Sequence, residues 1–280
     1  MPEGDTVWLA ASRLHTALAG SVLVDADLRV PQAATVDLTG REILAVVPRG
    51  KHLLTRLAGD GDDPEPGGLT LHTHFRMDGA WHLFRRGERW TAGPAWQIRA
   101  VLGTRDWSAV GYRLHDLQVL PTAREPDVVG HLGPDLLGPD WDLDEAVRRL
   151  RARPDRAVSP ALLDQRNLAG IGLLYATEVC FLRGVSPWTR ILDVPDLPGL
   201  VRTAQRMLAA NRGRWEQSTT GDTRRGREHW VFKRGGRPCR RCGTPVRVAE
   251  QSEARAPEQA RVTAWCPHCQ PGPSPEGSTG

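Results

Sequence analysis

The chain has 280 residues, of which 40% are hydrophobic and 25% charged, a composition typical of soluble globular proteins and a length that favours two domains. No apolar run approaches the ~20 residues of a membrane-spanning helix, and Glu3 and Asp5 stand where a signal peptide would be basic. We therefore expect a cytoplasmic protein rather than a membrane or secreted one. Its net charge of +4 and pI of about 9.0 show a mild excess of basic residues.

The chain begins Met1-Pro2-Glu3-Gly4, and a residue as small as proline at position 2 normally permits removal of the initiator methionine. Pro2 would then be a terminal secondary amine, with a pKa near ~8, able to attack an electrophilic carbon and form an imine. Glu3 places a carboxyl group beside it. Many proteins begin Met-Pro, so a processed and solvated terminus is the alternative.

Residues 5–18 carry apolar side chains at helical spacing and predict an amphipathic helix that ends at Gly20. From Ser21 to about Leu120 the chain changes to short β-rich runs separated by turn residues, which indicates an antiparallel sandwich or barrel. The runs are 22–30, 42–50, 52–58, 69–75, 80–84, 96–103 and 112–120. The Gly-, Asp- and Pro-rich segment 59–68 predicts a flexible hairpin tip.

After Pro121 the pattern becomes helical, with helices expected over 142–153, 160–168, 173–183 and 197–211. The second and third helices are joined by Asn167-Leu168-Ala169-Gly170-Ile171-Gly172. Glycines at a helix start let the backbone approach a ligand and direct N–H groups at an anion. A helix pair joined in this way binds DNA in several folds, although tight helical turns also contain glycine for packing reasons alone.

Basic residues are distributed unevenly along the chain. Only Lys51 and Lys233 are lysines among 37 basic residues, so a lysine that remains is a candidate for proton delivery, which arginine cannot provide. This argument selects Lys51 as a site residue. Between Arg202 and Arg247 there are 13 basic and three acidic residues, which suits a polyanionic partner, with a solvated basic surface as the alternative.

Four of the five cysteines form two CxxC pairs, Cys239/Cys242 and Cys266/Cys269, separated by 23 residues. In a cytoplasmic protein this spacing predicts one structural zinc ion held by four thiolates, which leaves no open position for catalysis. The zinc would hold a hairpin with Arg261 at its tip. We expect 249–260 to be a mobile insertion and 271–280 a disordered tail.

With these residues in view, the chain resembles the formamidopyrimidine-DNA glycosylase / endonuclease VIII family of bifunctional base-excision repair enzymes over residues 1–270. Five landmarks in the family's order carry the resemblance: Pro2 to Gly4, Gly50 to Leu54, His131 to Leu137, Leu163 to Gly172, and Cys239 to Gln270. Pro-Glu-Gly, and the absence of an Asp-Pro-Arg-Arg-Phe-Gly run around 104–111, is similar to the endonuclease VIII branch.

The resemblance implies an α+β multidomain fold with DNA in the cleft between its halves. It places a β-sandwich catalytic domain with an N-terminal helix at 1–122 and a helix–two-turns–helix DNA-binding domain at 123–232. A C-terminal zinc finger follows at 233–270 and the tail at 271–280. The implied protein acts as a monomer, in a bacterial-type cytoplasm, in association with the nucleoid.

The resemblance also implies roles for single residues. Pro2 would attack C1′ of the damaged nucleotide, Glu3 would act as the acid at the sugar ring oxygen, and Lys51 would contact phosphate and donate a proton during elimination. His74 and Arg261 would hold the phosphates that flank the flipped nucleotide, and Arg261 would assist a second, δ, elimination. The implied further DNA contacts are Arg76, Met77, His131, Gly170, Gly172 and Leu173.

Three of these positions call for comment. Met77 matches a position at which the family inserts an apolar wedge into the DNA, with an ordinary strand residue as the alternative. Arg76 lies where the endonuclease VIII branch often has glutamine. Leu173 replaces the asparagine that follows the family's Gly-Ile-Gly turn, so a side-chain donor to phosphate is lost and only the backbone N–H remains.

The sequence thus predicts a DNA glycosylase with abasic-site lyase activity that removes oxidised bases, pyrimidines foremost, from double-stranded DNA. Two alternatives stay open: a zinc-finger DNA-binding protein without catalysis, which Leu173 keeps in view, and an abasic-site lyase without glycosylase activity.

Overall fold

The structure, a computed structural model, describes residues 2–59, 67–253 and 256–275. The chain divides into two compact units, Met1–His131 and Leu132–Gly280, which we describe one at a time. The expected loss of Met1 falls outside the described residues, as do most of the expected hairpin tip at 59–68 and half of the expected tail at 271–280. Among the described residues, no helix has the length and hydropathy needed to cross a membrane.

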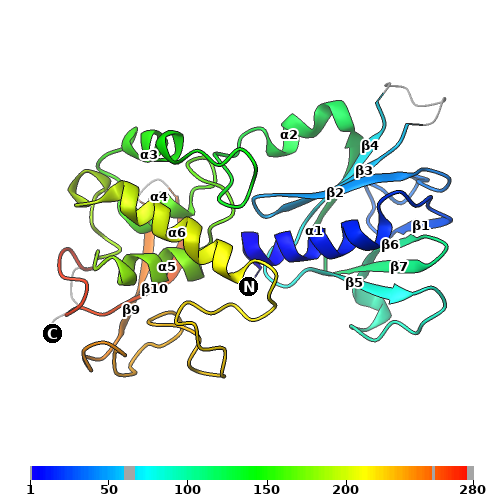
Figure 1. Ribbon diagram of the computed structural model, residues 1–280. Helices are drawn as coiled ribbons and strands as arrows, with labels where there is room; N and C mark the ends of the chain where they lie inside the picture. The colour runs from blue at the N-terminus through cyan, green and yellow to red at the C-terminus, as the bar shows by residue number, and fades with distance from the viewer. Residues whose placement is uncertain (1, 60–66, 254–255, 276–280) are drawn as a thin grey trace. The chain divides into compact units, whose positions relative to one another are not determined.

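The first unit is a helix and two antiparallel sheets of four strands each, in the orders β2-β3-β4-β8 and β1-β6-β7-β5 (Figure 1). One hydrophobic core joins side chains from α1 and both sheets, which confirms the predicted β-sandwich with its N-terminal helix. The elements are α1 (Gly4–Leu18), β1 (Asp25–Leu28), β2 (Ile43–Arg49), β3 (His52–Leu57), β4 (Leu69–His74), β5 (Ala80–Arg85), η1 (Ala95–Gln97), β6 (Ile98–Gly103), β7 (Trp107–Tyr112), β8 (Asp116–Pro121), η2 (Thr122–Arg124) and α2 (Glu125–Val129).

Strand β7 was not expected from the sequence. Its residues from Ser108 to Tyr112 are all buried, because Ala109 lies in the core shared with α1, whereas Val110 and Tyr112 lie in a second hydrophobic cluster. A strand covered on both faces does not need alternating polar side chains, and so it carries no period-two signal. Helix α1 fits its prediction more closely: Gly20, with φ of +77°, follows the C-cap Ala19 in the left-handed conformation expected there.

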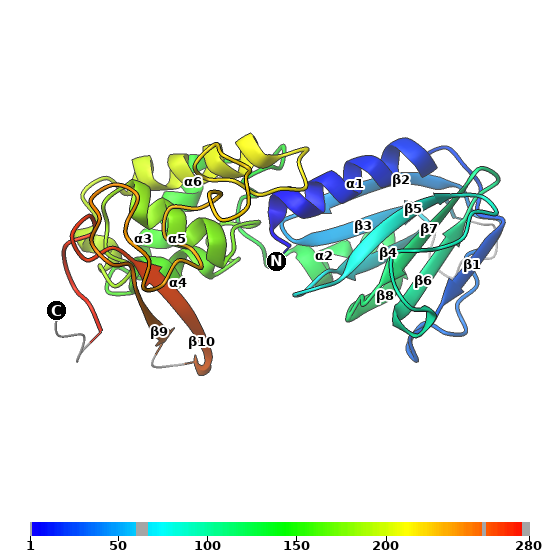
Figure 2. The same ribbon diagram turned by 90° about the horizontal axis from the view of Figure 1, so that it is seen from below.

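The second unit packs four helices around a hydrophobic core and adds a long β-hairpin, which is clearest in the view from below (Figure 2). The elements are α3 (Leu143–Arg151), α4 (Val158–Leu163), α5 (Leu173–Leu182), η3 (Ile191–Asp193), α6 (Leu197–Asn211), β9 (Arg247–Glu253) and β10 (Ala256–Trp265). The four predicted helices all exist, but α4 ends five residues earlier than expected. Its last residues are instead used in the turn that leads to Gly170.

The expectation of a mobile insertion at 249–260 is wrong for the described residues, because 249–253 and 256–260 lie in β9 and β10. The hairpin is anchored by Gln251, whose side-chain amide donates to the carbonyl of Pro187 at 3.0 Å. Arg261 pairs with Gln251 within β10 and is therefore not at the hairpin tip. Polar side chains on both faces of these strands conceal their β pattern in the sequence.

Candidate functional site

The N-terminal residues place Pro2 next to a buried acid. Pro2 is half-buried, and Glu3, the N-cap of α1, has none of its surface exposed. Its carbonyl accepts the N–H of Val7 at 3.1 Å, and Asp5 in the first helical turn is also fully buried. A carboxyl group at this end of a helix lies in the favourable field of the helix dipole. Pro2 and Glu3, which we expect to act together, therefore lie at the buried first turn of α1.

Strand register brings Lys51 and His74 to the same end of one sheet. Lys51 follows Gly50, whose φ of +59° forms the tight turn between β2 and β3. The next residue, His52, pairs with His74 on β4, and their ring centroids are 4.7 Å apart. Lys51 and His74, which the sequence analysis selected separately, thus lie at neighbouring strand ends. His52 lies between them, since it follows Lys51 in the chain and pairs with His74.

The histidines at this edge are neutral at physiological pH. Burial is the main cause that lowers the pKa of His74 to about 4, helped by the nearby charges of Arg76 and Lys51. Burial and the neighbouring imidazoles of His74, His72 and His131 lower the pKa of His52 to about 3. Any contact that these rings make with an anion is therefore made by a neutral N–H donor.

A tight turn after β4 carries the two predicted contacts that follow His74. Arg76 has a φ of +50°, and its backbone N–H donates to His74 Nδ1 at 3.0 Å. Its guanidinium pairs with Asp116 at 2.6 Å, an exposed ion pair that costs little to exchange for a phosphate. Met77 is 67% exposed in this turn, so its interpretation as an ordinary strand residue is wrong. An exposed apolar side chain beside Arg76 suits the predicted wedge.

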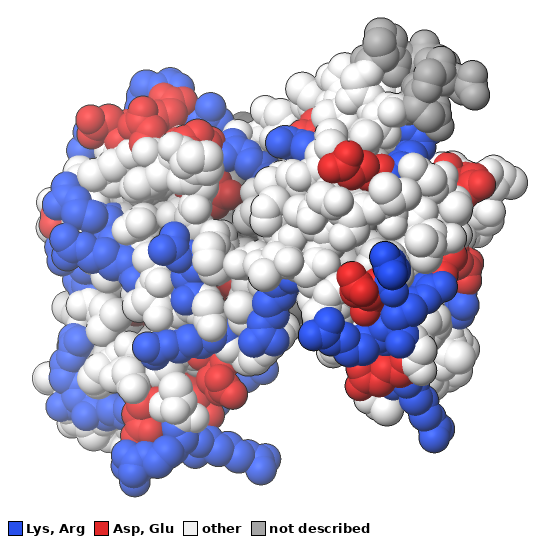
Figure 3. Space-filling view, turned by 45° about the vertical axis from the view of Figure 1, so that its right-hand side comes forward, with Lys and Arg blue, Asp and Glu red and all other residues white. Residues whose placement is uncertain are grey.

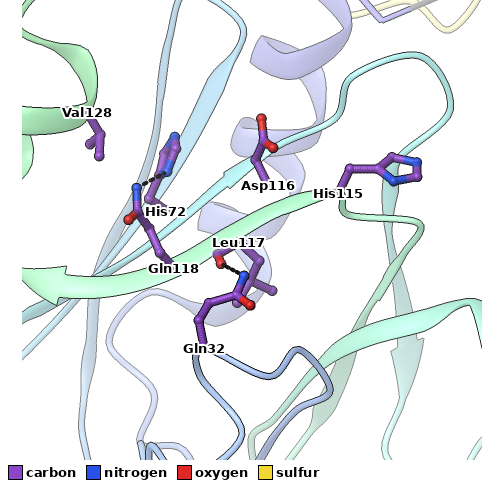
Figure 4. A pocket seen from close by; sticks show the side chains of 7 residues that line it. All are labelled: Gln32, His72, His115, Asp116, Leu117, Gln118 and Val128. Carbon is purple, nitrogen blue, oxygen red and sulfur yellow. Dashed lines mark hydrogen bonds between the residues drawn. The ribbon is translucent and has the colours of Figure 1, made fainter.

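His131 is exposed at the end of the first unit, with its ring centroid 6.3 Å from that of His52. A cavity of about 350 Å³ lies on the face of the sheet β2-β3-β4-β8 that carries His72 and Gln118 (Figure 4). It is lined by Gln32, His72, His115, Asp116, Leu117, Gln118 and Val128. Sequence reasoning missed His52 and His72, although histidine at 52, 72 and 74 on runs read as neighbouring strands was a usable signal.

In the second unit, two of the sequence landmarks form one structure. Asp135 bridges to Ala169, and a side chain at Gly133 would lie 2.5 Å from the carbonyl oxygen of Asn167. Gly170 has a φ of +98°, and its N–H donates to Gln165 Oε1 at 3.0 Å. The stretch that starts at Leu132 therefore packs against the glycine turn and holds its backbone in place.

The glycine turn leads directly into α5, at the end of the helix where the dipole favours an anion. Gly172 is the N-cap and Leu173 the first helical residue, half-buried against the helical core. The N–H of Gly170 and the amide of Asn167 are already used, the latter on the carbonyl of Ala161 at 2.8 Å. Asn167 is thus poorly placed to replace the side chain missing at Leu173.

The four predicted zinc ligands converge. The Sγ atoms of Cys239, Cys242, Cys266 and Cys269 all lie within 4.8 Å of one another. Cys239 and Cys269 are 3.9 Å apart and Cys242 and Cys266 3.5 Å, close to the ~3.8 Å between thiolates that bind zinc tetrahedrally at ~2.3 Å. The set therefore fits a metal ion. Cys180 is instead buried in the helical core, and burial raises its pKa to about 12.

A buried acid organises the basic segment before the cysteines. Glu178 on α5 is fully buried, and its carboxylate accepts the backbone N–H groups of Trp230, Val231 and Phe232, each at 2.8 Å. Basic side chains are prominent over this unit in the space-filling view (Figure 3). The sequence signal was a single acid within an otherwise uncharged helix, and it was overlooked.

The comparisons with known proteins agree with this geometry. The sequence profile of the formamidopyrimidine-DNA glycosylase N-terminal domain matches residues 1–118. The chain is 57% identical to the "Probable endonuclease 8 2" of Streptomyces coelicolor, over 100% of this chain and 98% of that protein. It is 44% identical to the "DNA-(apurinic or apyrimidinic site) lyase Nei2" of Mycolicibacterium smegmatis, over 96% of this chain and 99% of that protein.

Solved structures give the same fold. The Lactococcus lactis Fpg protein in complex with DNA that contains an oxidised pyrimidine superposes with a TM-score of 0.77 at 21% identity, covering 97% of this chain and 100% of that one. The same protein bound to DNA that contains an abasic site gives a TM-score of 0.75.

Proposed function

The chain belongs to the formamidopyrimidine-DNA glycosylase / endonuclease VIII family, and from this premise we propose that it is a DNA glycosylase and abasic-site lyase of base-excision repair. Its substrate would be double-stranded DNA with an oxidised base, pyrimidines foremost, or with an abasic site. The relatives named above come from bacteria, and we place the protein on chromosomal DNA in the cytoplasm, as a monomer.

The observation that carries the proposal is the half-buried Pro2 beside the wholly buried Glu3 at the start of α1. Once Met1 is removed, the Pro2 nitrogen attacks C1′, and the damaged base leaves with its bonding electron pair and takes up a proton. Glu3 protonates the sugar ring oxygen, the ring opens, and an iminium joins Pro2 to C1′.

The iminium makes the C2′ proton acidic, and its loss expels the 3′ phosphate. Lys51 contacts the phosphate and delivers a proton in this elimination, and a second elimination expels the 5′ phosphate with help from Arg261. His74, Arg76 and His131 contact the strand from the first unit, and Met77 fills the space left by the flipped base. Gly172 and Leu173 contact phosphate from the second unit through the backbone at the start of α5, and Gly170, whose N–H already donates to Gln165, shapes the turn that precedes them.

We assign one structural zinc ion to Cys239, Cys242, Cys266 and Cys269. When bound, it cross-links the hairpin and takes no part in the chemistry, because four thiolates fill its coordination shell. Backbone N–H groups of Arg241 and Cys269 donate to Cys239 Sγ and Cys266 Sγ at 3.4 and 3.5 Å, which stabilises the ionised thiolates.

Borohydride trapping tests the proposal. The protein is mixed with an oxidised-pyrimidine duplex, an abasic duplex and an intact duplex in the presence of borohydride. We expect a covalent adduct with the first two, and mass spectrometry should place it on Pro2 with Met1 absent. Cleavage without an adduct, or by a protein that retains Met1, would contradict the mechanism.

A second candidate function is lyase activity alone, which the name of the Mycolicibacterium relative favours. The same assay separates the two functions, because a pure lyase forms an adduct with the abasic duplex and none with the oxidised base. Binding to both duplexes without any adduct would instead support the non-catalytic alternative.

A further inference from the structure

Three side chains on one face of the first sheet form a hydrogen-bonded row. On β4 and β8, His72 and Gln118 pair directly, and His72 Nδ1 lies 3.3 Å from the side-chain nitrogen of Gln118 (Figure 4). His72 Nε2 lies 2.8 Å from His52 Nδ1, and the two rings stack with centroids 5.1 Å apart. His72, in the middle of the row, is only 5% exposed, whereas His52 is partly buried and Gln118 is exposed.

The hydrogen bonds of the row all run in one direction, from Gln118 through His72 to His52. The amide nitrogen of Gln118 can only donate, so His72 Nδ1 accepts. Burial lowers the pKa of His72, the ring is neutral, and its single proton is on Nε2. His72 therefore donates to His52 Nδ1, and the single proton of neutral His52 is on its own Nε2.

His74 reaches the same tautomer by another route. Its Nδ1 accepts the backbone N–H of Arg76 at 3.0 Å, so its proton is also on Nε2. His52 and His74 are register partners, with ring centroids 4.7 Å apart. The edge next to Lys51 therefore holds two adjacent neutral rings, each with an Nε2–H donor.

We propose that His52 joins His74, whose phosphate contact the family resemblance already implies, in binding one backbone phosphate of DNA through their Nε2–H groups, and that His72 and Gln118 are positioning residues that fix the tautomer of His52. The inference rests on the proposed function, since DNA is the ligand. A phosphate suits the pair because its oxygens accept several hydrogen bonds at once, and because Lys51, the first residue before His52, adds a positive charge.

Neutral donors to phosphate can be distinguished from cationic ones by the salt dependence of the affinity for DNA. A cationic contact displaces a condensed counterion from DNA, and each one steepens the salt dependence of affinity by about 0.9 in a plot of log K against log salt. A neutral imidazole displaces none. Loss of His52 should therefore weaken binding equally at every salt concentration, whereas loss of Lys51 should also flatten the slope.

The experiment measures affinity for a duplex with a reduced abasic-site analogue, which cannot form an iminium, at several salt concentrations. We expect His52→Phe to bind about tenfold more weakly with an unchanged slope, since a hydrogen bond to a charged group is lost. His52→Gln, whose amide can place an N–H near the former Nε2, should recover part of the loss. His115→Phe is the matched control, because this exposed histidine bonds Asp78 and not the row.

Nitrogen NMR of the wild-type histidines tests the positioning claim without any variant. His52 should show an unprotonated Nδ1 and a protonated Nε2. His72→Phe removes the donor to His52, so the two tautomers of His52 should mix and affinity should fall several-fold. Thermal unfolding of each variant establishes that the measured protein is folded.

A protonated Nδ1 on His52 in the wild-type protein would overturn the inference, and so would folded His52→Phe with wild-type affinity. These failures differ from a failure of the proposed function. A wild-type protein that cleaves abasic DNA while His52→Phe binds normally refutes the phosphate pair alone, whereas a wild-type protein that neither traps nor cleaves refutes the proposed function.

Discussion

The two units prepare for a phosphate backbone by different physical means. In the site proposed above, the first unit would use the neutral imidazoles of His52 and His74, which strand register places together and whose pKa values are lowered to about 3 and 4, with Lys51 beside them. The second unit uses formal charge, with 13 basic residues between Arg202 and Arg247 against three acids. Beyond α6, most of this segment lies outside helices and strands, and the buried Glu178 side chain accepts three of its backbone N–H groups.

The difference shows that one unit can supply hydrogen-bond donors in fixed positions while the other supplies positive charge. Neutral donors in a sheet give directional contacts that depend little on salt, whereas arginines on loops give affinity that falls steeply with it. The loops need internal supports of their own, namely the cysteine cluster and Glu178. Removing a support from one unit should therefore leave the other intact.

Loss of the metal should have the largest effect. Structural zinc sites contribute about 10 kcal/mol or more of apparent binding free energy to folding. Cys266→Ser or a strong chelator should therefore disorder β9, β10 and the segment before them. Hydrogen exchange should increase there, whereas β3 and β4 of the first unit should stay protected. His268→Ser is the control, since this exposed residue between two ligands is not in the cluster. Equal loss of protection in both units would contradict the separation.

Glu178→Gln should have the next largest effect. The carboxylate accepts three backbone N–H groups, and a glutamine has only one acceptor oxygen to offer them. Each buried donor left without a partner costs about 1–3 kcal/mol, so we expect the second unit to lose about 2–4 kcal/mol in denaturant unfolding. The exposed Glu216→Gln should change nothing. A Glu178→Gln protein as stable as wild type would show that the segment is held by other contacts.

The sequence was sufficient where a pattern reports burial on one face. Helix α6 matched its predicted bounds, Leu197–Asn211, because its apolar stripe and the N-cap Asp196 are both local signals. Strand β7 was lost because both of its faces are covered. Residues 249–260, whose described part lies in β9 and β10, were taken for an insertion, because a polar hairpin held by a buried Gln251 has no apolar alternation.

The candidate site divides in the same way. Pro2, Lys51 and the cysteines could be found because residue type and spacing alone indicate their chemistry. The histidines at 52 and 72 were visible on neighbouring predicted strands, but which residues they face depends on strand register, which places His52 opposite His74 and His72 opposite Gln118. A register is set by the whole sheet and cannot be derived from a short motif.

Acid should destabilise the first unit through its histidines. His52 and His74 have folded-state pKa values of about 3 and 4, well below the ordinary 6.5, so between these limits the unfolded chain binds more protons. Stability should therefore fall as pH decreases below about 6.5, by at most ~1.4 kcal/mol per pH unit for each histidine. The window from pH 6.5 to 5 is the clearest, because carboxylates such as Glu125 lose their stabilising ionisation only below it.

Denaturant unfolding of the first unit across this window makes the measurement. His52→Phe should flatten the dependence by the share of one group, and His115→Phe should leave it unchanged. An unaltered slope in His52→Phe would mean that His52 is not the neutral buried group described above.

The smallest effect is expected at the start of α5, where the second unit has lost a directional donor. Leu173→Asn would place an amide beside the first N–H groups of the helix, and a new hydrogen bond to phosphate is worth about 1 kcal/mol, roughly fivefold in affinity for abasic-site DNA. Leu173 is half-buried against the helical core, so about 1 kcal/mol of stability should be lost at the same time. Leu192→Asn, at a residue 51% exposed in the same unit, controls for the substitution itself. If Leu173→Asn gains no affinity, the backbone N–H already satisfies the phosphate, and the second unit does not lack the directional contact that the first unit draws from its histidines.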